Sequence, residues 1–121
     1  MSAEIVGYSF DDVPSDGFFY HETKKIVEIY FEDNGKQVVA EWDTRQYPCK
    51  LVIEKWTDAL GRLDGVQKSM FHALSYHIGA VGLLLHAEYK NDRLELHINT
   101  TDDRYVTWVF ISPEIRVELL G

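Results

Sequence analysis

A single cysteine among 121 residues, Cys49, excludes an internal disulfide and is typical of a chain in a reducing compartment. The sequence also lacks a long apolar run, since the longest one, Ile78–Leu85, contains two glycines and is far shorter than a membrane span. The first residues, Met1–Glu4, have neither the basic nor the apolar part of a secretory signal. We therefore expect a cytoplasmic protein that binds no membrane.

Basic residues are scarce. Twelve Lys and Arg against 20 Asp and Glu give a formal net charge of −8. Because phosphate binding depends on Lys and Arg, this balance excludes nucleic acid as a partner. It favours a basic protein, whose encounter a negative field accelerates at low salt. The alternative is that the charge only keeps a small protein soluble, and the composition leaves both explanations open.

Catalytic signatures are absent as well. No serine lies in a G-x-S-x-G sequence, and the glycines do not have the spacing of a phosphate-binding loop. Cys49 falls on an inward position of a predicted strand, where a small core residue is more typical than a nucleophile. We expect a non-enzymatic protein with no cofactor.

Two hairpins can be given a register from the sequence. The dipeptide Asn34-Gly35 in Lys25–Asp43 is a strong turn signal, and a two-residue turn there places Glu28 opposite Glu41 on the outer face. The segment Leu83–Thr100 turns at residues 91–92. Its predicted pairs are Leu85 with Ile98, Ala87 with Leu96, His86 with His97, and Glu88 with Glu95. Like charges directly opposed on a sheet are destabilising, so their repetition needs a reason, which a basic partner would supply.

The fold class follows from the order of the remaining elements. A strand is predicted at Cys49–Trp56, with Cys49, Leu51 and Ile53 inward, and the next segment, Thr57–Leu63, is ambiguous between a loop and a helical turn. One helix is predicted to start at Asp64 and to end at Gly79 or Gly82, because apolar residues recur there at helical spacing. Arg104–Ile111 and Ile115–Leu120 are predicted strands. We expect one α+β domain over residues 1–121, an antiparallel, curved or split sheet with one main helix on its apolar face, in the order strands, helix, strands.

The histidines are the candidates for a metal or acid–base site. His86, His97, Glu88 and Glu95 are expected on one open face, where a solvated polar surface is favoured and no metal is predicted. On a helix, His72 and His77 point about 140° apart and cannot share a ligand.

A partner-binding face is predicted on the outer side of the first hairpin and its neighbouring strand, where aromatic anchors lie among carboxylates. Its residues are Glu28, Tyr30, Glu32, Glu41, Asp43, Glu54 and Trp56. The alternative is that this face packs against another segment of the same chain, such as Asp11–Tyr20. Trp108 and Phe110 are assigned to the core.

The run Tyr20–Ile26, followed by the Asn-Gly hairpin and by Cys49–Trp56, resembles the small acidic immunity proteins of bacterial polymorphic and contact-dependent toxin systems. The step His21-Glu22 differs from the commoner His-Asp of such proteins. The resemblance implies a cytosolic inhibitor that neutralises a cognate basic toxin, often a nuclease, by masking its active site or an adjacent surface.

Two other functions stay open. One is a secretion-chaperone-like or adaptor protein that grips an extended peptide along a sheet edge. The other is a small-ligand-binding α+β domain, with a pocket between helix and sheet lined by His77, Tyr76 and Trp108. The sequence is compatible with a monomer or a dimer.

Overall fold

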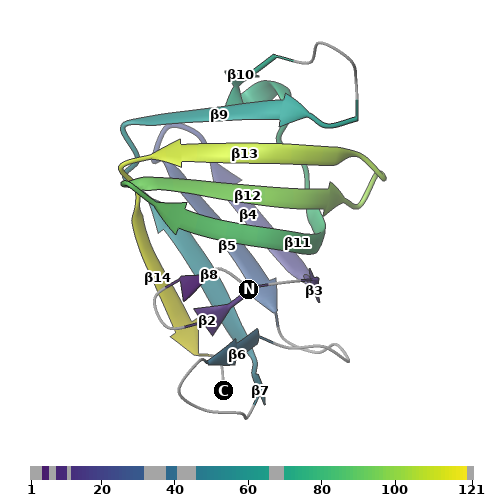
Figure 1. Ribbon diagram of the computed structural model, residues 1–121, viewed down its shortest axis with the longest axis vertical. Helices are drawn as coiled ribbons and strands as arrows, with labels where there is room; N and C mark the ends of the chain where they lie inside the picture. Colours follow the sequence, from purple (N-terminus) through teal and green to yellow (C-terminus); the bar gives the residue numbers. More distant parts are fainter. Residues whose placement is uncertain are drawn as a thin grey trace.

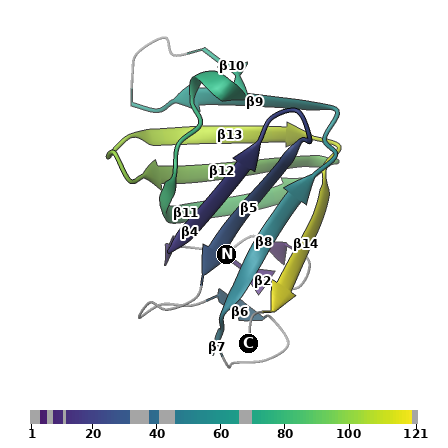
Figure 2. The same ribbon diagram turned by 180° about the vertical axis from the view of Figure 1, so that it is seen from behind.

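Three antiparallel sheets make up the fold, and the two larger ones pack face to face (Figures 1 and 2). The computed structural model describes residues 4–5, 8–10, 12–31, 38–40, 46–65 and 70–119, and of residues 4–5, 8–9, 38–40 and 46–47 the backbone alone. Every registered strand pair is antiparallel, as the sequence predicts.

The six-stranded sheet has the order β10-β9-β13-β12-β11-β3. Its strands are β3 (Val13–Pro14), β9 (Asp58–Leu63), β10 (His72–Ala73), β11 (Val81–Lys90), β12 (Arg93–Thr100) and β13 (Tyr105–Ile111). The back sheet has the order β14-β8-β5-β4, with strands β4 (Gly17–His21), β5 (Ile26–Phe31), β8 (Cys49–Glu54) and β14 (Glu114–Leu119). A small sheet, β1-β2-β6-β7, consists of β1 (Glu4–Ile5), β2 (Tyr8–Ser9), β6 (Val38–Ala40) and β7 (Gln46–Tyr47).

The strands of the two larger sheets cross at a steep angle, and the core lies between them (Figure 2). In β5 alternate residues face the core: Val27, Ile29 and Phe31 are buried. Trp108 and Phe110 of β13 are fully buried, as predicted, and so are the inward residues of β8. Burying side chains of this kind stabilises the fold by about 1.5–3 kcal/mol each.

The predicted main helix is absent, so the α+β assignment is wrong and the described residues form an all-β structure. After β9 the chain makes a turn, the two-residue strand β10 and a 3₁₀ turn at Leu74–Tyr76, before β11 begins. The carboxylate of Asp64 does not cap a helix; it accepts a hydrogen bond from the Thr107 hydroxyl at 2.8 Å. Val81 and Leu84 pair with β12, so ladder bonds to a distant strand replace the helical bonds that the spacing predicts.

The first predicted hairpin does not form as expected either. β5 pairs with β4 on one side and with β8 on the other, and this places Glu28 opposite Phe19 and Val52. With both edges of β5 occupied, β6 pairs with β2 and β7 instead. Glu41 and the Asn34-Gly35 turn lie outside the described residues.

The second hairpin has the predicted register over most of its length. His86 pairs with His97, Ala87 with Leu96 and Glu88 with Glu95. The turn residues Asn91 and Asp92 both have positive φ, 54° and 60°, as a two-residue I′ turn requires. One prediction is wrong: Leu84, not Leu85, pairs with Ile98, because a register shift inserts an extra residue between Leu84 and His86.

A corner joins the two larger sheets. β8 continues into β9, and β13 into β14, so that two long strands remain paired while both bend from one sheet into the other. The bends carry two residues with positive φ, Lys55 at 55° and Ser112 at 51°. Thr57 closes the corner, since its backbone N–H donates to the Ile111 carbonyl at 2.8 Å. The segment 57–63, which is ambiguous from the sequence, therefore consists of the end of this corner and of strand β9.

Candidate functional site

The outer face of the back sheet carries the described part of the predicted partner-binding face. Glu28 accepts hydrogen bonds from the Tyr30 hydroxyl at 2.7 Å and from Lys50 Nζ at 3.3 Å. The hydrogen bond to Glu28 raises the pKa of Tyr30, because loss of the phenolic proton would remove it. Glu54 pairs with Arg116 of β14. The two predicted carboxylates on this face are therefore paired with cations of the same sheet.

Trp56 is not an exposed anchor. Its side chain is 6% exposed and packs against Phe110, with ring centroids 4.9 Å apart. Trp56 therefore belongs to the core and not to the predicted partner-binding face. Tyr30 remains on the outer face beside Lys50. The other predicted members, Glu32, Glu41 and Asp43, lie outside the described residues.

The outer face of the six-stranded sheet carries the other predicted polar residues. The His86 and His97 rings are 6.1 Å apart, and Glu88 lies directly opposite Glu95 one ladder step along. Glu95 contacts two cationic or potentially cationic groups: Arg93 at 3.3 Å and His97 Nε2 at 3.1 Å. Glu88 lies 3.9 Å from His86 Nε2, and its side chain is 50% exposed. A shallow hollow of about 350 Å³ lies here, lined by Glu88, Lys90, Asn91, Arg93 and Glu95.

A buried threonine links this face to β9. Thr107 is fully buried, and its hydroxyl is 2.8 and 2.9 Å from the two carboxylate oxygens of Asp64 and 3.1 Å from His97 Nδ1. One hydroxyl proton can be donated only once, so Thr107 donates to Asp64 and accepts from His97. Arg62 lies 3.4 Å from the same carboxylate. The resulting chain runs from Asp64 through Thr107 and His97 to Glu95. Sequence reasoning missed Asp64 and Thr107, because it had no strand at residues 58–63 beside β13.

His72 and His77 meet at the other edge of this sheet. Nδ1 of His72 is 3.3 Å from Nε2 of His77, which corrects the expectation that the two rings point apart. That expectation assumed a helix. With a 3₁₀ turn between them instead, His72 pairs with Gly61 in the ladder and the side chain of His77 lies over the same glycine.

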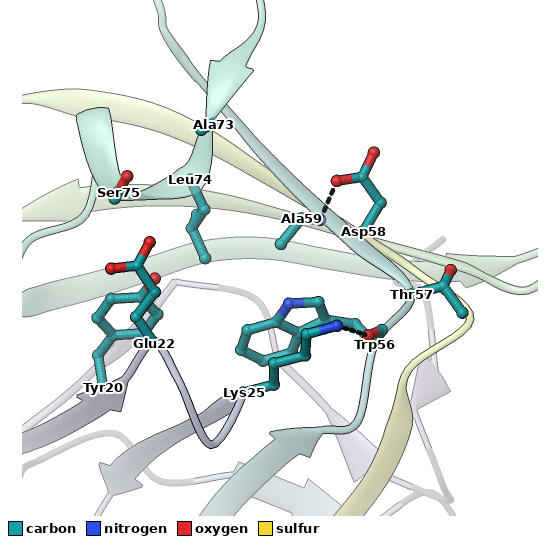
Figure 3. A pocket seen from close by; sticks show the side chains of 10 residues that line it. All are labelled: Tyr20, Glu22, Lys25, Trp56, Thr57, Asp58, Ala59, Ala73, Leu74 and Ser75. Carbon is teal, nitrogen blue, oxygen red and sulfur yellow. Dashed lines mark hydrogen bonds between the residues drawn. The ribbon is translucent and has the colours of Figure 1, made fainter.

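A pocket of about 200 Å³ opens where the edges of the two larger sheets meet (Figure 3). Its wall is made by Tyr20, Trp56 and Leu74, and Lys25 extends across the indole to donate to the Trp56 carbonyl at 3.3 Å. Glu22 and Asp58 line the same pocket. This volume is below the usual range for small-molecule sites, about 300–1,000 Å³. The different pocket predicted between helix and sheet has no helix to form it: Trp108 is fully buried, its indole N–H donates to the His77 carbonyl, and Tyr76 is 75% exposed.

The described part of the chain contains no cluster of three or more His, Cys, Asp or Glu side chains placed to hold a metal ion. Burial raises the pKa of the Cys49 thiol to about 12, which leaves it protonated and unreactive at neutral pH. Among these same residues, no helix is long and apolar enough to cross a membrane.

Comparisons with protein-family models, with curated proteins and with solved structures give no match to this chain.

Proposed function

We propose that this chain is a non-enzymatic, immunity-like inhibitor that binds a basic protein, a cognate toxin such as a nuclease, and masks its active site. The observation that supports this is the like-charge pair Glu88–Glu95 on the outer face of β11 and β12. A cationic side chain of a partner would lie between the two carboxylates and remove their repulsion.

The six-stranded sheet offers a better binding face than the back sheet predicted from the sequence. On the back sheet, Glu28 and Glu54 are neutralised across the ladder by Lys50 and Arg116, so a partner gains little charge attraction there. On the six-stranded sheet, Glu95 is likewise paired, with Arg93 and His97, but Glu88 is half exposed beside a hollow that can receive a side chain. The interface that we propose is therefore centred on Glu88, Glu95 and the neighbouring His86 and His97.

A charge reversal separates binding from folding. The substitution Glu88→Lys places opposite charges across the ladder, so the free protein should become more stable, by about 0.2–1 kcal/mol, while its affinity for a basic partner falls. Glu114→Lys is the matched control, because Glu114 is also an exposed strand carboxylate directly opposite a glutamate, Glu54, but lies on the back sheet, away from the proposed face, with Lys55 3.3 Å away.

The assay is a pull-down from the native cell lysate with wild type, Glu88→Lys and Glu114→Lys, eluted by a salt step. We expect one basic protein to be retained by wild type and by the control, released by salt and lost with Glu88→Lys. The purified partner should lose its toxic activity when wild type is added. Retention that neither salt nor Glu88→Lys weakens, or a captured protein that stays fully active, would contradict the proposal.

Extended-peptide binding is the second candidate, and the edge strand β4 favours it. Among the described strands β4 has one neighbour, β5, and it carries Phe18, Phe19 and Tyr20 in sequence, with Phe19 45% exposed. Unprotected aromatic edges of this kind accept a further strand. Phe19→Lys should abolish such binding and leave the Glu88-dependent interaction unchanged.

A further inference from the structure

A pair of imidazoles at the end of the six-stranded sheet is held in place by the backbone around it. His77 closes the 3₁₀ turn, with its N–H donating to the Leu74 carbonyl at 2.9 Å, and its own carbonyl accepts from the indole of Trp108 at 3.1 Å. His72 is fixed by its ladder position opposite Gly61. A Cβ on Gly61 would lie 3.0 Å from Cβ of His77, so a larger residue at position 61 would require His77 to shift slightly away from the sheet.

The separation of the two nitrogens is informative. Nδ1 of His72 and Nε2 of His77 are 3.3 Å apart, at the long end of hydrogen-bond distances, so a direct N–H···N hydrogen bond between the rings is the alternative to a shared ion. Two imidazole nitrogens bound to one tetrahedral zinc ion, each at about 2.0–2.1 Å, are separated by about 3.3–3.4 Å. The ring centroids are 5.4 Å apart with 47° between the planes, so the rings are not stacked parallel.

We propose that His72 and His77 bind a divalent transition-metal ion of the zinc class, with water in the remaining coordination positions. Neutral imidazole suits zinc, copper and nickel, and an open coordination sphere is compatible with the exposed position of His72. No third histidine, cysteine or carboxylate joins them among the described residues, so the site is exchangeable rather than structural.

The positive charge of Arg104 acts on His77 and opposes a bound cation. Its guanidinium is paired with Asp102 at 2.9 Å and donates to the Ile78 carbonyl at 3.2 Å, which reduces its effect at the site.

This site is independent of the proposed partner-binding face. His86 and His97 lie on the outer face of β11 and β12, whereas His72 and His77 belong to the segment that follows β9. The second pair is therefore a natural control: its rings are 6.1 Å apart, and the nitrogens of His97 already contact Thr107 and Glu95.

The test is calorimetric titration of the tag-free, chelator-treated full chain with zinc chloride at pH 7.5, repeated at pH 5.5. We expect one ion per chain, weaker binding at the lower pH, and a loss of affinity of at least about tenfold with His72→Asn. His72 is exposed, so this variant should fold, which its unfolding temperature without metal would check. His86→Asn should bind like wild type.

Histidine resonances in an NMR spectrum identify the ligands directly, since only those of His72 and His77 should shift on zinc addition. No binding at millimolar zinc would overturn the proposal. Equal affinity in wild type and His72→Asn, or a loss confined to His86→Asn, would overturn it as well.

Discussion

Replacing Thr107 with valine tests the buried polar chain on the six-stranded sheet. Valine keeps the branched shape of threonine but lacks the hydroxyl that donates to Asp64 and accepts from His97. A hydrogen bond to a charged group contributes about 1.5–3 kcal/mol, and an orphaned partner adds to the loss when it is buried.

Solvent sets the size of the effect. The Asp64 side chain is 28% exposed and that of His97 33%, so water can replace part of what is lost. We therefore expect Thr107→Val to lower the free energy of unfolding by about 1–2 kcal/mol. For a domain of this size, that corresponds to a fall in Tm of about 4–8 °C.

The measurement is urea and thermal unfolding followed by tryptophan fluorescence, for which the buried Trp56 and Trp108 are suitable probes. Thr101→Val is the matched control, because Thr101 is exposed in the β12–β13 turn and should lose less than about 0.5 kcal/mol. A Thr107→Val protein as stable as wild type would refute the role we give to the hydroxyl.

Two further predictions concern turns and corners. Lys55 has φ of 55° at the bend between β8 and β9, and its pairing with Glu114 is highly exposed, so Lys55→Gly should be more stable than Lys55→Ala by about 1 kcal/mol in urea unfolding. Lys24 is the control, because it is not among the positive-φ residues, and there Lys24→Ala should be more stable than Lys24→Gly. If the glycine variant were the more stable one at both positions, or the alanine variant at both, the result would count against backbone strain at the corner. Hydrogen bonds from Ser112 and then Tyr89 lower the pKa of Asp92, so its contribution to stability is present above the unfolded value near pH 4 and is lost as the pH falls through the lower folded value. Asp92→Asn, which the turn conformation tolerates, should flatten the decline of the urea midpoint between about pH 5 and pH 2, and an unchanged slope would exclude this contribution.

The second hairpin could be predicted because its information is local. Leu94, Leu96 and Ile98 alternate on the buried face, and the adjacent turn residues accept positive φ, so pattern and turn specify one register. The extra residue near Leu85 could not be predicted, since an apolar run of three leucines fits the inner face with either register.

The first hairpin and the helix failed for a different reason. The alternation of apolar residues in β5 shows which face is buried but not which strand lies beside it. The turn of residues 22–25 that joins β4 to β5 contains no glycine or asparagine, so the sequence gives no turn signal there. The helical spacing covers residues 64–81, but from Val81 onward the chain is strand β11, which pairs with β12. In both places a distant strand outweighs a local signal.

The candidate site shows the same division between local and distant information. Glu88 and Glu95 could be placed because one hairpin contains both. Thr107 reaches His97 across ten residues and Asp64 across 43, so their contact exists only once β13 lies between β12 and β9. His72 and His77 come together because residues 72–77 do not form a helix, whereas the spacing of apolar residues predicts one there.

The inner residues of the second hairpin also decide what its outer residues mean. Ala87, Leu94 and Leu96 are buried and, with the turn, are sufficient to set the register next to the turn. Glu88 and Glu95 are therefore not needed to align the strands, and their direct opposition lowers the stability of the hairpin. A lysine at position 88 would remove this opposition, whereas Glu95 also contacts Arg93 and His97. If binding explains the pair, stability and affinity must change in opposite directions in Glu88→Lys, and a variant that gains stability while keeping its partner would leave the opposed carboxylates without a role in recognition.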